Sequence, residues 1–178
     1  MSADFFAYAI AYVLKNEGGA AFVNASDDAG GPTKFGVCQV TLSHWRLSHL
    51  QPAATEDDVR NLPEEEAEQI YRILYWAPVH GHQIINQAVA CAMLDVAVLC
   101  GVGTATKLAQ GVLGLEQDGI FGPKTLAAIN SHAPGYFLPL FVAALKEHLY
   151  RIVHFKPSQA KFWQGWVARA NRLLNLPV

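Results

Sequence analysis

The sequence predicts a mainly α-helical bundle with one small β-hairpin after the first helix. Apolar residues recur at helical spacing in most segments, and turn-forming residues concentrate in one early stretch. Of the 178 residues, 52% are hydrophobic and 16% are charged, which is typical of a globular chain rather than a disordered one. A chain of this length forms one domain, or one domain with a small extension, and buries an adequate core.

Charge, cysteine and histidine usage exclude several functional classes. The formal net charge is −2 and no clustered basic face is evident, so the sequence supplies no case for nucleic acid or an anionic membrane. The three cysteines lack CxxC spacing, which indicates reduced core thiols rather than disulfides or a zinc site. His80 and His82 lack the i, i+4 spacing of helical metal ligands, so no metal is expected.

The first helix, predicted over residues 4–15, directs a glutamate toward the core. Phe6, Ile10 and Val13 share one face, and Glu17 continues that face before Gly18-Gly19 ends the helix. A carboxyl group held against apolar neighbours ionises less readily, as a general acid requires near neutral pH. The alternative is a solvated helix terminus, which the spacing alone favours.

A turn-rich stretch follows this glutamate. Residues 27–33 include two adjacent aspartates, two glycines and a proline, and the flanking residues 22–23 and 34–40 are predicted as two short strands. Such a hairpin would return a carboxylate toward Glu17. Two carboxyl groups across a cleft, one protonated and one ionised, are the usual means of cleaving a glycosidic bond.

The remaining chain is predicted to be helical. The expected helices cover residues 41–49, 55–62, 64–77, 86–100, 104–113, 123–131, 136–154 and 158–174. Thr55 and Asp58 show the spacing of a capping box. The segment 86–100 is the most apolar and should therefore form the centre of the bundle. Its length of about fifteen residues is too short to span a bilayer of roughly 30 Å.

Motifs along most of the chain resemble those of one known family. They are EGG at residues 17–19, DAGGPTKFG at 28–36, YRILYW at 71–76, DVAV at 95–98 with Gly101, DGIFGPKT at 118–125, and FWQGW at 162–166 with Arg169. These strings resemble the EGGY, DPGGxTxxG, YxxxYW, DxAVNxG, DGxxGPxT and GWxxR motifs of glycoside hydrolase family 108. That family comprises peptidoglycan muramidases of prophage-endolysin and secretion-activator type, so the resemblance implies a lysozyme-like fold.

The resemblance also implies roles for individual residues. Glu17 falls on the catalytic acid, and Asp28 would position or activate water, or stabilise positive charge on the sugar. Thr33 would bind the water or orient the aspartate.

Three further residues are candidate substrate contacts. Tyr71 and Tyr75 would line a sugar groove or belong to the core, since an aromatic stripe at helical spacing fits both. Asp95 would contact substrate or be satisfied structurally within its helix.

The chain departs from the family pattern in three places. Ala20-Ala21 lengthen the segment before the aspartate by two residues. Leu99 replaces an asparagine of the cleft wall, and Pro32 replaces a polar residue before the threonine.

The implied reaction is hydrolysis of the β-1,4 bond between N-acetylmuramic acid and N-acetylglucosamine in peptidoglycan glycan strands, without a cofactor. Two alternatives remain open: a lytic transglycosylase, and a non-catalytic wall-binding or secretion-activating protein. Residues 1–105 are expected to form the lysozyme-like catalytic part. Residues 106–178 are expected to form a helical part that resembles a peptidoglycan-binding region, packed into the same globule.

The N-terminus suggests where the protein acts. The apolar residues 5–14 follow an acid and no base, and no small-residue cleavage site follows them, so we read them as a helix and not as a signal peptide. We therefore expect synthesis in the bacterial cytoplasm and action in the periplasm or cell wall, after release through a holin-like pore or an exporter.

Overall fold

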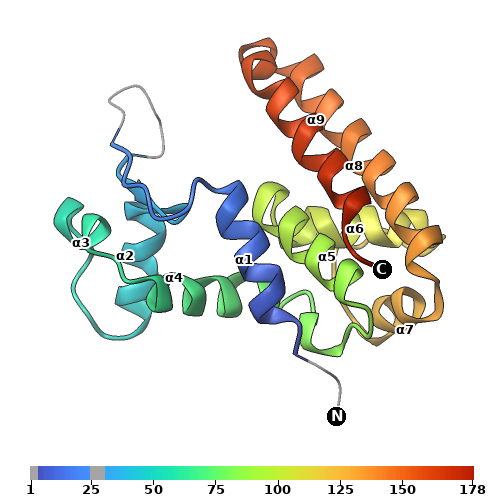
Figure 1. Ribbon diagram of the computed structural model, residues 1–178, viewed down its shortest axis with the longest axis horizontal. Coiled ribbons are helices and arrows are strands. Elements are labelled where there is room, and N and C mark those ends of the chain that lie inside the picture. Colours follow the sequence, from blue (N-terminus) through green and yellow to red (C-terminus); the bar gives the residue numbers. More distant parts are fainter. Residues whose placement is uncertain (1–3, 25–30) are drawn as a thin grey trace. The chain divides into compact units, whose positions relative to one another are not determined.

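The computed structural model describes residues 4–24 and 31–178, which divide into two compact units (Figure 1). We call Ile10–Leu74 the hairpin unit, and Tyr75–Val178 with the segment up to Ala9 the C-terminal unit. Within the described residues the chain is mainly helical, and a two-stranded antiparallel sheet follows the first helix. The predicted fold class is therefore confirmed. The predicted division after residue 105 stays a prediction.

The first helix, α1, spans Phe6–Asn16, close to the predicted range. It ends in a tight turn in which Gly18 and Gly19 have φ values of 88° and 63°. The Gly19 N–H donates to the Leu14 carbonyl oxygen at 2.8 Å. Glycine adopts this left-handed backbone without a side-chain clash, so the EGG sequence stops the helix directly after Glu17.

The sheet consists of β1 (Thr33–Lys34) and β2 (Val37–Cys38), with Thr33 opposite Cys38. Phe35 and Gly36 form the turn between the strands, with φ values of 53° and 73°. Positive φ at both turn residues matches the right-handed twist of a two-residue hairpin. The prediction of one continuous strand over residues 34–40 is therefore wrong, because the chain reverses at Phe35-Gly36.

The other predicted strand, over residues 22–23, is reduced to a single antiparallel bridge between Val23 and Thr33. Both main-chain hydrogen bonds of this bridge are present, at 2.9 and 2.8 Å. The segment before β1 therefore pairs with the same strand as β2 does.

Three short helices complete the hairpin unit: α2 (Gln39–Ser48), α3 (Glu56–Arg60) and α4 (Glu64–Tyr71). The predicted capping box is confirmed: the Asp58 N–H donates to Thr55 Oγ1 at 3.2 Å, and the Thr55 N–H donates to Asp58 Oδ2 at 2.7 Å. The core contains Ile10, Val13, Leu42, Val59, Leu62 and Ile70. A π-helical turn, η1 (Arg72–Trp76), follows α4 where a continuous helix to residue 77 was predicted.

The C-terminal unit is built around α5 (Gln87–Cys100), in which every residue from Ala88 to Ala97 is buried. Asn86 caps this helix, since its Oδ1 accepts the Val89 N–H at 3.1 Å. Helix α5 contacts α6 (Val102–Val112), α8 (Pro134–Phe155) and the short 3₁₀ helix η2 (Gly81–Gln83). The predicted central position of this helix within its bundle is confirmed.

A loop between α6 and α7 (Pro123–Ser131) is organised by one buried glutamine. Gln110 Nε2 donates to Asp118 Oδ1 at 2.7 Å and to Thr125 Oγ1 at 3.1 Å, while its Oε1 accepts the Gly119 N–H at 3.0 Å. These bonds hold the DGIFGPKT segment against the end of α6. Because Asp118 also accepts the Ile120 N–H, the pKa of its carboxyl group lies below the usual range.

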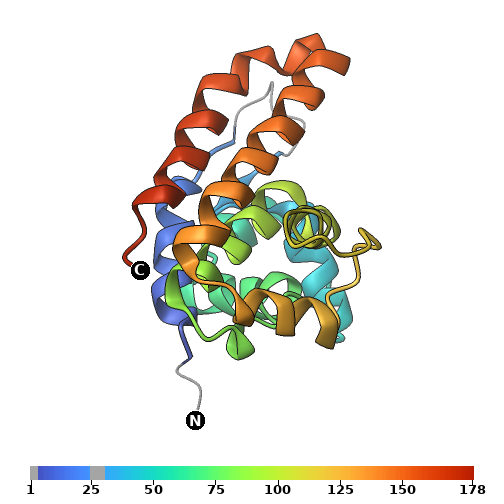
Figure 2. The ribbon, with the colours of Figure 1, turned by 90° about the vertical axis from the view of Figure 1, so that its right-hand side faces the viewer.

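Helix α8 and helix α9 (Trp163–Arg172) form an antiparallel pair joined by the 3₁₀ helix η3 (Pro157–Phe162). Figures 1 and 2 both show this pair extending beyond α5 and α6 of the same unit. The chain then ends with η4 (Leu173–Asn175). The predicted single helix over residues 158–174 is wrong at its start, where residues 157–162 adopt the tighter 3₁₀ form. Among the described residues, no helix is both long and apolar enough to cross a bilayer.

Candidate functional site

Glu17 lies immediately after the last residue of α1, and its side chain is partly exposed. Its N–H donates to the Val13 carbonyl oxygen at 3.0 Å, so the backbone of Glu17 still belongs to the helical hydrogen-bond pattern. The glutamate therefore lies at the end of helix α1, which holds its backbone in place. A side chain placed in this way keeps a defined position while remaining accessible.

The Glu17 side chain packs against the hairpin turn. A Cβ atom added at Gly36 would lie 2.8 and 2.9 Å from Glu17 Cβ and Cγ, and 2.4 Å from the Tyr71 hydroxyl oxygen. Only a residue without a side chain fits between Glu17 and Tyr71 at such distances. The Phe35 N–H also donates to the Gly19 carbonyl oxygen at 3.2 Å, which ties the hairpin turn to the loop that carries the glutamate.

Tyr71 supports this turn from the other side. Its side chain is 2% exposed, and its hydroxyl group donates to the Phe35 carbonyl oxygen at 2.9 Å. The hydroxyl group thus satisfies a main-chain acceptor in a two-residue turn whose φ values are both positive. The predicted substrate contact of Tyr71 stays a prediction. Tyr75, which belongs to the C-terminal unit, is partly exposed, and its predicted contact is likewise untested.

The structure describes one of the two predicted partners of the acid, Thr33. Thr33 begins β1, is partly exposed, and its hydroxyl group donates to the Gly31 carbonyl oxygen at 3.0 Å. Asp28 lies outside the described residues. The roles of both residues stay predictions.

Asp95, the third predicted substrate contact, is fully buried in α5. Arg169 of α9 approaches it with Nε at 3.1 Å from both carboxylate oxygens and with Nη2 at 2.9 Å from Oδ1. Within the C-terminal unit this pair joins two helices separated by 74 positions in the chain. Paired geometry of this kind offsets much of the cost of burying a carboxylate. The substrate role of Asp95 stays a prediction.

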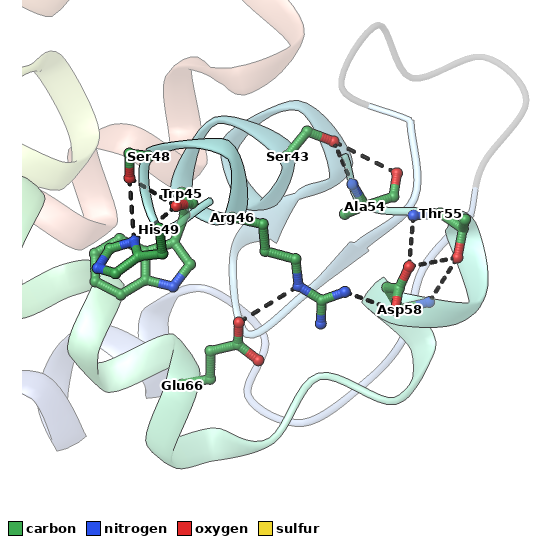
Figure 3. Close-up of polar contacts among 9 residues, drawn as sticks. All are labelled: Ser43, Trp45, Arg46, Ser48, His49, Ala54, Thr55, Asp58 and Glu66. Atoms are coloured by element: carbon green, nitrogen blue, oxygen red, sulfur yellow. Dashed lines mark hydrogen bonds and ion pairs between the residues drawn. The ribbon is translucent and has the colours of Figure 1, made fainter. Parts of the chain in front are cut away.

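A separate groove of about 590 Å³ lies between α2 and α4 of the hairpin unit. It is lined by Trp45, Arg46, His49, Gln51, Glu66, Gln69, Arg72 and Ile73. Figure 3 shows Arg46 between two acids, with Nη1 at 2.6 Å from Asp58 Oδ1 and Nε at 3.6 Å from Glu66 Oε1. The hydrogen bonds from Thr55, together with Arg46, hold the pKa of the Asp58 carboxyl group well below its usual range. Arg46 therefore ties α2 to α3 and α4.

Sequence reasoning missed the contribution of Gly36 and Phe35 to this site. Their signal was present, since Gly36 is the last residue of the DAGGPTKFG motif. The reason for that glycine is visible only in three dimensions, because Glu17, Gly36 and Tyr71 are far apart in the chain. Among residues 4–24 and 31–178, no cluster of three His, Cys, Asp or Glu side chains is arranged to hold a metal ion.

Comparisons with known proteins identify the family of the chain. The model of the family Glycosyl hydrolase 108 matches residues 10–101, and the model of a Predicted Peptidoglycan domain matches residues 104–171. A solved structure described as SagA of Brucella abortus is similar at 32% sequence identity and a TM-score of 0.78, over 94% of this chain and 90% of that chain. A comparison with curated proteins gives no match.

The matched family model covers more than half of the chain, and the similarity to the solved structure extends over nearly all of it. The motifs from EGG to FWQGW and the helical fold with its small hairpin agree with these matches. The chain is a peptidoglycan hydrolase that belongs to the glycosyl hydrolase 108 family.

Proposed function

We propose that this hydrolase is an N-acetylmuramidase that cleaves the β-1,4 bond between N-acetylmuramic acid and N-acetylglucosamine. The observation that carries the proposal is the packing of Glu17 against Gly36, with Tyr71 on the other side of the same glycine. A general acid must be held in a defined position beside the bond that it protonates. Here a helix end and a glycine turn, with a buried tyrosine behind the turn, hold the base of the glutamate side chain.

In the proposed mechanism Glu17 donates its proton to the glycosidic oxygen as positive charge develops at the anomeric carbon. The C–O bond to the leaving sugar then breaks, and water attacks the anomeric carbon. Asp28 positions or activates that water, or stabilises the positive charge. Thr33 binds the water or orients the aspartate. No metal or cofactor takes part in these steps.

The decisive experiment replaces Glu17 with Gln and follows the clearing of purified peptidoglycan. Glutamine preserves the size of the side chain but has no acidic proton, so we expect a loss of about 10³-fold in rate with an unchanged fold. Glu116→Gln, at an exposed position of the C-terminal unit, is the matched control and should clear normally. Normal clearing by Glu17→Gln would refute the assignment of the acid.

The nature of the products separates the proposed reaction from its alternatives. Mass spectrometry of released muropeptides should find reducing N-acetylmuramic acid ends, because water is the final nucleophile. Anhydro ends would contradict hydrolysis and identify a lytic transglycosylase. Binding to the wall without any release by the wild-type protein would instead identify a non-catalytic wall-binding protein.

A further inference from the structure

The net charge of −2 conceals a strong asymmetry along the chain. From His148 to Val178 the sequence contains five lysine and arginine residues and no aspartate or glutamate, so all 15 acidic residues lie before this segment. Such asymmetry is typical of chains that contact an anionic partner. The net charge of the whole chain is −2 because the acids before residue 148 outweigh the cations. That single value therefore gives no sign of a basic segment.

The end of the α8–α9 pair also exposes several aromatic rings. We call Tyr150, His154, Phe155, Phe162 and Trp163 the aromatic tip. Phe155 is 77% exposed, Tyr150 57% and Phe162 44%. Four of the rings adjoin, since the centroid of Tyr150 lies 6.1 Å from that of Trp163 and 6.0 Å from that of His154, which lies 5.1 Å from that of Phe155. Phe162 stacks on Trp166 at 5.7 Å. A contiguous group of exposed apolar rings on a folded protein indicates a binding surface.

Three exposed cations lie among these rings: Arg151, Lys156 and Lys161. Lys161 Nζ lies 5.0 Å from the centroid of the Phe162 ring. Arg151 and Lys156 line a groove of about 380 Å³ together with His148, Ile152 and Phe155. The acid nearest in sequence, Glu147, forms an ion pair with Arg151 and precedes the acid-free segment.

We propose that the aromatic tip binds the surface of an anionic lipid bilayer. Phe155 and Phe162 would enter the boundary between headgroups and acyl chains, while Tyr150 and Trp163 would lie at headgroup level, where amphipathic rings accumulate. Lys156 and Lys161 would contact the lipid phosphates.

The chemistry of the tip favours a bilayer over a glycan strand. The exposed Phe155 and Phe162 rings have no hydrogen-bonding groups, so they cannot bind the hydroxyl groups of a sugar by hydrogen bonds. Exposed apolar rings beside the exposed Lys156 and Lys161 are the composition of an interfacial membrane contact. This inference concerns a different surface from Glu17 and does not depend on the glycosidase proposal.

The test measures binding of the full-length protein to sedimented vesicles. We expect binding to vesicles of phosphatidylglycerol and phosphatidylethanolamine, weakening as salt is added, and little binding to phosphatidylcholine alone. The double variant Lys156→Gln/Lys161→Gln should lower the partition coefficient about 30-fold. Lys107→Gln/Lys124→Gln, on α6 and α7 of the same unit, removes the same charge elsewhere and should bind as the wild type does.

A second variant tests the apolar contribution. Phe155→Ser should lower the partition coefficient about tenfold without lowering the melting temperature, because the ring is largely exposed in the folded protein. Absence of vesicle binding by the wild type, or equal losses in the tip and control variants, would overturn the proposal. Loss of binding to purified peptidoglycan in the tip variants, with vesicle binding unchanged, would also overturn it and would make the tip a wall-binding surface.

Discussion

The two units each contain an acid that the family motifs single out, and the two acids are held in opposite ways. In the hairpin unit, Glu17 stands partly exposed at a helix end and packs against the backbone of Gly36. In the C-terminal unit, Asp95 is fully buried and paired with Arg169. A family motif thus selects the residue type, whereas the burial of that residue and its ion-pair partner determine which chemistry it can perform.

The energetic consequences of the two arrangements differ. A carboxylate buried against an arginine stabilises the fold only while both partners remain, because removal of one leaves the other charged and desolvated. A partly exposed carboxyl group contributes little to the stability of the fold, but it can approach a ligand. Glu17 is therefore open to a ligand, whereas Asp95 is enclosed with Arg169.

The largest expected effect comes from breaking the buried pair. Asp95→Ala leaves Arg169 buried without this carboxylate and should lower the free energy of unfolding by about 3–5 kcal/mol. Urea denaturation at neutral pH measures the change. The double variant Asp95→Leu/Arg169→Met removes both charges and should recover most of the lost stability. A stable Asp95→Ala protein that clears peptidoglycan slowly would instead support the predicted substrate contact.

A smaller effect is expected at the hairpin turn. Gly36→Ala forces a methyl group against Glu17 and Tyr71, and should lower the free energy of unfolding by about 2 kcal/mol and the clearing rate about tenfold. Gly31→Ala is the matched control, because its φ of 65° is similar but no atom of residues 4–24 or 31–178 lies within 4 Å of the added atom. That control should lose only about 1 kcal/mol and remain active. Equal behaviour of both variants would contradict the positioning role of Gly36.

The smallest expected effect concerns Cys100, the last residue of the helix α5 that carries Asp95. Burial raises the pKa of the Cys100 thiol to about 11, with Asp95 contributing in the same direction and Arg169 opposing it. Because the folded-state pKa lies above the unfolded value, this stabilisation is complete below about pH 9 and is lost as the pH rises toward 11. The free energy of unfolding of the wild type should therefore fall more steeply over this interval than that of Cys100→Ala.

The difference between the two pH profiles should be under about 1 kcal/mol, since Cys100 is only partly buried. Chemical denaturation at several pH values measures it. Parallel profiles for the wild type and Cys100→Ala would show that water reaches this end of α5.

Most helices were predictable because their signals are local. The Asn86 cap of α5, the capping box at Thr55 and the proline at the start of α7 act within a few residues, so the sequence pattern contains them. The EGG turn after α1 belongs to the same class. The hairpin was predicted in the right place but with the wrong strands, since Phe35 carries no turn signal of its own and adopts positive φ in a tertiary setting.

The sequence by itself determined the helical class and the family motifs, and it predicts Glu17 as the acid. Only the tertiary structure decided that Gly36 separates Glu17 from Tyr71, that Asp95 is paired with Arg169, and that the rings of α8 and α9 gather at one tip. The physical reason is the distance along the chain over which each kind of interaction acts. Helix periodicity and caps act between neighbours in the chain, whereas packing and ion pairing join residues that become neighbours only after folding.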